Sequence, residues 1–269
     1  MLRFVDVRII YLFSDIFVVP FCVVFNRSRR SAWYFYRHRM GFGFFKSVHM
    51  TWRNHCMFSQ VVIDRFAMYA GRRFKVQIVG EDLFAQFSER PEGFLQLSSH
   101  IGNYEIAGYS LRSGKGIHAV VYSNEKESVM QGRSSMFSKN NVSMIALKED
   151  MSHLFEIDSA ICSGDIVSFP SDRYMAGSKC VTAHFLGKDA KFPLGPFSVA
   201  AMRGVDVLAV NVMKSSLTGY RIYMTQLHYD KNLPRKDQTS QLCRAYAAEL
   251  ERMLRMYPSQ WFNFYDFWA

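Results

Sequence analysis

Hydrophobic and polar positions along the chain switch repeatedly between two periods, which predicts strands and helices in alternation. Short apolar or alternating runs, several of them bounded by Gly or Pro, predict strands. Apolar positions three and four residues apart predict the helices between them. The expected strands are 74–79, 93–98, 117–122, 142–147, 165–169, 181–186, 205–213 and 220–229, and the expected helices are 103–111, 126–138, 152–162, 195–203 and 238–257.

This order of elements predicts an α/β fold with a mixed, largely parallel sheet flanked by helices. The first 70 residues differ, because they are aromatic and helical in pattern, with one long helix expected over 33–70. We therefore expect an N-terminal apolar and basic helical segment over 1–70 and an α/β domain over 71–269, acting as one functional unit. The 269 residues are enough to bury a sizeable core.

An apolar run over 9–25, IIYLFSDIFVVPFCVVF, indicates that the N-terminal segment contacts a membrane. Its length is at the short limit for crossing a bilayer, and it contains Asp15 and Pro20. It lacks the small-residue cleavage site of a signal peptide. The interpretation we prefer is an interfacial or shallowly inserted helix, with a single membrane span and an ordinary buried helix as alternatives.

The positive charge is concentrated beside this run. The formal net charge is +10, and residues 1–80 hold 13 Lys/Arg against 3 Asp/Glu, whereas the rest of the chain holds 20 of each. Arginines that follow the apolar run would face anionic headgroups, at about 1 kcal/mol each near the surface. We rank nucleic acid below anionic membrane lipids as a partner, because no RNA- or DNA-binding motif accompanies the arginines.

The composition and the absence of several motifs exclude some classes of site and favour an apolar partner. Aromatic residues make up 16% of the chain, which suggests contact with lipid or another apolar partner. The five cysteines are scattered without a C-x-x-C pair, which argues against a disulfide framework or a zinc site and for a reducing compartment. No ligand set suggests a catalytic metal. The sequence also lacks a G-x-S-x-G elbow, a Walker loop and a G-x-G-x-x-G fingerprint.

The clearest candidate for chemistry is a pair at the end of the expected strand 93–98, His100 and Glu105 in the pattern H-x4-E. Open α/β folds hold ligands at such strand-to-helix turns. We predict His100 as a general base and Glu105, in the first helical turn, as the acid that orients the imidazole. Backbone N–H groups of Gly102 and Asn103 are candidate oxyanion donors, and so is a basic side chain such as Arg133. A lone histidine is more often structural, but the acid and the Gly-Asn turn favour a catalytic pair.

The box His100-Ile-Gly-Asn-Tyr-Glu105 resembles the H-x4-D/E box of glycerolipid-type acyltransferases, and the wider pattern is similar to bacterial lipid A biosynthesis (lauroyl/myristoyl) acyltransferases. The similarity covers roughly residues 5–260. Arg173 stands where that family usually has Gln, and the C-terminal PSQWFNFYDFW departs from its usual pattern. Other similar segments are 121–122 with the downstream Arg133, 164–167, 171–173, 185–187, 195–203 and 205–212.

The resemblance implies a membrane-associated acyltransferase that moves a fatty acyl chain from an acyl carrier protein thioester, or acyl-CoA, to a hydroxyl or amine of a lipid or lipid-linked acceptor. It implies no cofactor, and a place at the cytoplasmic face of a Gram-negative inner membrane, peripheral or single-span. The acceptor stays open between a lipid A precursor, an amino-acid lipid and a polyene-type pigment head group. Acyl chain length, ester or amide product, and oligomeric state stay open as well.

Three further residues are weaker candidates for substrate binding. Arg133 would grip an anionic acceptor or the phosphopantetheine of the donor, or else it is a solvated surface arginine. Asp172 and Arg173 follow the strand end at Pro170 and either pair with each other or contact substrate. The aromatic residues of 261–268 either pack on the core or make a second membrane contact.

Two other functions fit parts of the pattern. One is a non-enzymatic peripheral membrane scaffold, which would have no use for a paired His100 and Glu105. The other is a thioesterase, which would release free fatty acid without an acceptor.

Overall fold

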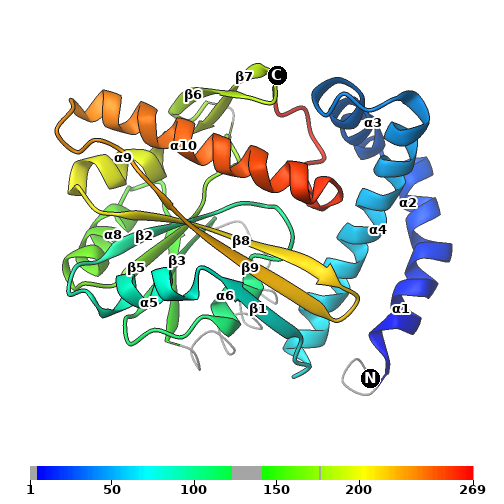
Figure 1. Ribbon diagram of the computed structural model, residues 1–269, viewed down its shortest axis with the longest axis horizontal. Helices are drawn as coiled ribbons and strands as arrows, with labels where there is room; N and C mark the ends of the chain where they lie inside the picture. The colour runs from blue at the N-terminus through cyan, green and yellow to red at the C-terminus, as the bar shows by residue number, and fades with distance from the viewer. Residues whose placement is uncertain (1–4, 123–140, 176, 269) are drawn as a thin grey trace.

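The chain folds around a seven-stranded sheet with helices on both faces and an N-terminal helical segment packed at one end (Figure 1). The computed structural model describes residues 5–122, 141–175 and 177–268. Along the sheet the strand order is β1-β9-β8-β2-β5-β3-β4. The strands are β1 Lys75–Val79, β2 Phe94–Ser98, β3 Ile117–Tyr122, β4 Val142–Leu147, β5 Ile166–Pro170, β8 Val207–Ser216 and β9 Gly219–Leu227.

Five of these strands run in one direction, which confirms the predicted mixed, largely parallel sheet. β2 pairs in parallel with both β5 and β8, and β3 pairs in parallel with β5 and β4. β9 is antiparallel to β8, and β1 follows the direction of β9. Because β2 and β5 are parallel neighbours, their carboxyl ends meet at the same edge of the sheet, where such folds place ligands.

Each face of the sheet has its own apolar core. One core lies under α10 (Arg235–Met256), whose buried positions recur every three or four residues, as a core-facing helix requires. The other core lies under α5 (Glu81–Glu89) and α6 (Glu105–Ser110). The first face carries α8 His153–Cys162, α9 Leu194–Arg203, α10 Arg235–Met256 and the hairpin β6 Cys180–Phe185 with β7 Lys188–Pro193; the second carries α5 Glu81–Glu89 and α6 Glu105–Ser110.

Three elements differ from the prediction. The expected helix over 33–70 is broken into α3 Ser28–Tyr34, a π-helical turn and α4 Phe44–Tyr69, because the chain turns at Gly41, whose φ is +69°. β7 and α5 were not expected, since both are short and largely polar. The expected helix over 126–138 lies outside the described residues.

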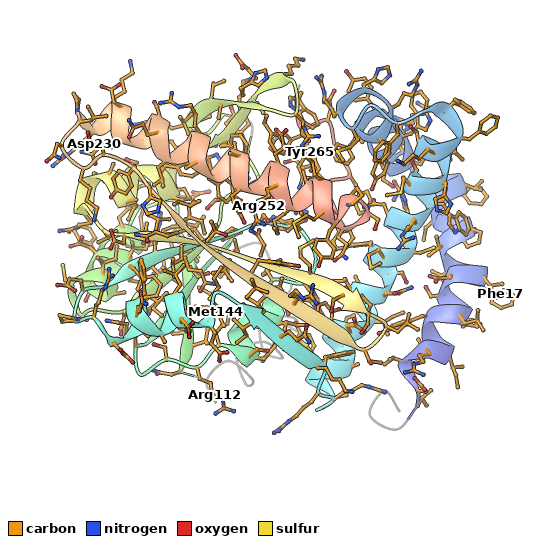
Figure 2. The ribbon with its side chains drawn as sticks, in the orientation of Figure 1. Phe17, Arg112, Met144, Asp230, Arg252 and Tyr265 are labelled. Carbon is orange, nitrogen blue, oxygen red and sulfur yellow. The ribbon has the colours of Figure 1, made fainter. Side chains whose placement is uncertain are left out.

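The N-terminal helices α1 Val7–Phe13 and α2 Val19–Phe25, joined by the π-helical turn Ser14–Val18, form one rod along α4 (Figure 1). The rod is long and apolar enough to cross a membrane. Its buried side faces α4, yet its outer side is apolar too, and Phe17 points away from the rest of the protein (Figure 2). The outer side consists of Ile9, Leu12, Phe13, Ile16, Phe17, Phe21, Val24 and Phe25.

A buried polar cluster ties this rod to the sheet. The carboxylate of Asp64 on α4 accepts hydrogen bonds from Tyr11 of α1, Lys214 of β8 and Tyr220 of β9. Burial raises the pKa of Asp64, opposed by Lys214 and the two tyrosines. Burial likewise lowers the pKa of Lys214, opposed by Asp64. The cluster therefore depends on having both charges present.

Replacing Asp64 by Leu is expected to destabilise the fold by about 3–5 kcal/mol, because it leaves the Lys214 ammonium buried without its counter-charge. Urea unfolding in detergent, followed by circular dichroism, measures the loss. The matched control is Asp64→Leu combined with Lys214→Met, which removes both charges and should recover most of the stability. A single Asp64→Leu variant as stable as the wild type would contradict this account.

Candidate active site

The turn after β2 is held in place from two sides. Gly102 has φ +60°, and a Cβ there would lie 1.9 Å from the carbonyl oxygen of Val212, so only glycine fits. The N–H of Gly102 donates to the carbonyl of Gln260 at 2.8 Å, and the N–H of Asn103 donates to that of Val212 at 2.9 Å. The prediction that these two N–H groups form an oxyanion hole is therefore corrected, since both already bind carbonyl oxygens.

The carboxylate that orients His100 is Asp172, not Glu105 as predicted. Nδ1 of His100 lies 2.7 Å from Oδ1 of Asp172. Oδ2 of Asp172 accepts the backbone N–H of His100 at 3.0 Å and the indole N–H of Trp261 at 3.2 Å. An ionised carboxylate can only accept hydrogen bonds, so Nδ1 carries a proton, and in the neutral ring the lone pair is then on Nε2.

Asp172 is ionised in this arrangement. Burial by itself would raise the pKa of its carboxyl, but the His100 ring and backbone N–H, with Arg173, hold the pKa below its ordinary value. A lowered pKa means that folding favours the carboxylate. Above pH 3.9, roughly the ordinary pKa of an aspartate, the ionised Asp172 therefore contributes fully to the free energy of unfolding. This contribution is lost as the pH falls through the lower pKa that Asp172 has in the folded protein.

Glu105 lies in the same cavity as His100 but faces α4. Its Oε2 accepts the hydroxyl of Tyr69 at 2.6 Å, and its Oε1 is 3.6 Å from a guanidinium nitrogen of Arg65. Arg65 also donates to the side-chain oxygen of Asn103 at 3.3 Å and lies over the ring of Tyr104. Sequence reasoning missed Arg65 and Tyr69, because they come from α4, far upstream of the H-x4-E box.

A cavity of about 90 Å³ lies between α6 and the sheet, and both His100 and Glu105 line it. Its other walls are mostly apolar, and the further polar residues in its lining are Gln96, Ser98, Tyr104 and Ser168. His100 is 18% exposed, so its ring is accessible, whereas Asp172 behind it is 1% exposed. The remaining apolar lining includes Ala107, Ile117, Ala119, Val121, Val142 and Val210.

Residues 37–269 match the family model described as bacterial lipid A biosynthesis acyltransferase. The chain belongs to this family. No curated protein matches the chain. Membership shows an acyltransferase with a lipid acceptor, of a family that needs no cofactor.

The other predicted site residues of this lipid A acyltransferase-type chain fall in different places. Asp172 hydrogen-bonds to the ring of His100 and is 1% exposed, and its contact with substrate stays a prediction. Arg173 donates to the backbone carbonyl of Phe262 at 3.3 Å, and within the described residues no ion pair joins it to Asp172. Arg133 lies outside the described residues.

The C-terminal segment packs behind His100 and Asp172. The N–H of Phe262 donates to the carbonyl of His100 at 3.2 Å. Asn54 of α4 donates to the carbonyl oxygens of Ser259 and Trp261. Of the two alternatives for the aromatic residues, the structure supports packing on the core, since Trp261, Phe262, Phe267 and Trp268 are buried.

Proposed function

We propose that this protein transfers a fatty acyl chain from an acyl carrier protein thioester to a hydroxyl or amine of a membrane lipid, with His100 as the general base. The observation that carries the proposal is the 2.7 Å hydrogen bond from Nδ1 to Asp172. It leaves Nε2 with its lone pair on the opposite side of an accessible ring. Such a histidine can take a proton from an acceptor.

The reaction needs no acyl-enzyme. The acceptor oxygen or nitrogen loses its proton to Nε2 of His100 as it attacks the thioester carbonyl. The new acyl–oxygen or acyl–nitrogen bond forms, the carbon–sulfur bond breaks, and the leaving thiolate takes the proton back from Nε2. Asp172 stabilises the imidazolium that exists between these steps. General-base catalysis of this kind contributes about 10²–10⁴-fold in rate.

Glu105 is proposed to position the acceptor. A carboxylate offers about four acceptor positions, so Glu105 can accept a hydrogen bond from the acceptor beside those from its neighbours. Arg65 and Tyr69 hold the carboxylate toward the cavity wall on the α4 side. This role keeps Glu105 in contact with substrate while Asp172 orients the base.

A basic cleft supports an acidic carrier protein as donor. Arg72, Arg73 and Arg112 line a cleft of about 430 Å³ between the end of α4, β1 and the end of α6. Arg112 extends outward from the edge of the protein (Figure 2). Met68 also lines the cleft, next in sequence to Tyr69, which contacts Glu105. Complementary charge of this kind steers an acidic partner and fixes its orientation.

The N-terminal rod supports attachment to a membrane. A helix that is apolar on its outer side as well as on its packed side suits a lipid environment rather than water. Phe44 and Phe45 extend the apolar surface at the start of α4, and Phe45 is 85% exposed. The arginines after the rod suit the anionic cytoplasmic leaflet. We therefore propose the cytoplasmic face of the bacterial inner membrane, with anionic lipids as partners.

Deleting the gene is expected to leave one cellular lipid short of a single acyl chain, because its acyl acceptor is no longer modified. Lipid profiling of the deletion strain by mass spectrometry would identify that lipid. Wild-type protein should restore the chain, and a His100→Ala variant should not. An unchanged lipid profile would contradict transfer and favour the scaffold. Release of free fatty acid by purified protein, with no acceptor requirement, would favour a thioesterase.

A further inference from the structure

A groove on the N-terminal segment lies apart from the active site. It has a volume of about 570 Å³ and is formed where the end of α2 meets α3 and α4. Its described lining residues do not overlap with those of the His100 cavity. They are Val23, Arg29, Arg30, Trp33, Tyr34, Val48, Thr51 and Trp52.

The walls of this groove are mainly apolar and continue into the exposed apolar surface. Trp33 makes an edge-on contact with Phe44, with ring centroids 6.3 Å apart. Phe44 and its neighbour Phe45 are among the exposed hydrophobic residues, as are Val48 and Trp52 of the groove itself. An apolar chain entering the groove from the membrane would therefore stay in contact with apolar side chains.

Two guanidinium groups give the groove its charge. Arg29 donates to the carbonyl of Val23 at 2.8 Å and also to that of Val24, so it closes the end of α2 and is fixed there. For the Arg30 guanidinium, the described parts of the chain supply no hydrogen bond or ion pair. None of the described lining residues is acidic. Asp266 lines a cavity on the other side of Arg30, where it accepts the backbone N–H of Trp268.

We infer that this groove binds a single anionic phospholipid from the surrounding membrane. Its phosphate lies at Arg30, because a guanidinium matches phosphate oxygens with two parallel hydrogen bonds. One acyl chain lies between Trp33 and Trp52. The inference rests on the proposed membrane attachment, and it adds a defined lipid site that holds α2, α3 and α4 against the bilayer. A basic pocket between helices at the cytoplasmic side is the usual form of such sites.

Native mass spectrometry of the full-length protein in detergent tests the site, with phosphatidylglycerol and phosphatidylcholine as probes. The wild type should retain one phosphatidylglycerol in preference to phosphatidylcholine. Arg30→Gln should weaken phosphatidylglycerol binding about fivefold, the effect of removing one favourable cation–phosphate contact. Arg27→Gln is the matched control, because it removes the same charge from an exposed position outside the groove. It should retain the wild-type preference.

Flotation with phosphatidylglycerol vesicles separates this inference from the proposed function. The wild type and both variants should float, because the apolar outer side of the rod is unchanged in all three. A wild type that does not float would overturn membrane attachment and the lipid site with it. Equal phosphatidylglycerol binding by Arg30→Gln and Arg27→Gln, or equal retention of both lipids by the wild type, would overturn the site alone.

Discussion

Asp172→Asn is expected to lower kcat by up to about 10⁴-fold. The asparagine amide can donate to Nδ1 of His100, which would move the ring proton to Nε2. A protonated Nε2 cannot take a proton from the acceptor. Because Asp172 is buried behind the ring, KM for donor and acceptor should change little. Steady-state transfer from a long-chain acyl carrier protein thioester measures the effect.

Two tryptophans of the C-terminal segment supply a second test of the role of Asp172 and its matched control. Trp261 donates its indole N–H to Asp172, whereas Trp268 donates its own to the backbone carbonyl of Phe185 at 3.3 Å. Trp261→Phe keeps an aromatic side chain but removes one hydrogen bond to a charged group, so kcat should fall about tenfold. Trp268→Phe should cost similar stability and leave kcat unchanged. Wild-type turnover in a folded Asp172→Asn variant would refute the role assigned to Asp172.

The sheet was predictable because its strands are short apolar or alternating runs, and the central ones, such as β2 and β8, are almost entirely buried. β3 and β4 have the predicted bounds, and β2 differs from its prediction by one residue. Burial of the central strands is what a parallel sheet covered on both faces requires. α5 and β7 escaped prediction because neither has a long apolar pattern, and they owe their structure to packing on other elements. The break before α4 was missed because apolar residues continue through it.

The site was predictable only in part, because its acid partner is distant in sequence. The spacing of His100 and Glu105 drew attention to the nearest acid, although α6 begins at Glu105 and turns that side chain toward α4. A signal for Asp172 was present. His100 and Asp172 each follow a strand end, and those strands proved to be parallel neighbours whose ends meet. Strand order, which local patterns do not reveal, was the missing information.

His100→Ala is the second substitution with a large expected effect, a fall in kcat of about 10²–10⁴-fold. The ring is partly exposed at the cavity, so the variant should fold, which circular dichroism would verify. Because His100 and Asp172 act as one unit, adding Asp172→Asn to His100→Ala should cause no further loss. A further large fall in the double variant would mean that Asp172 acts independently of the ring.

Glu105→Gln, measured in the same assay, tests whether Glu105 or Asp172 orients the imidazole of His100. Glutamine keeps an oxygen that can accept the Tyr69 hydroxyl, but it removes the negative charge beside Arg65. If Glu105 positions the acceptor, KM for the acceptor should rise more than kcat falls. If Glu105 instead orients the base, its loss should lower kcat as much as Asp172→Asn does. Only the first outcome agrees with a ring whose Nδ1 is already bonded to Asp172.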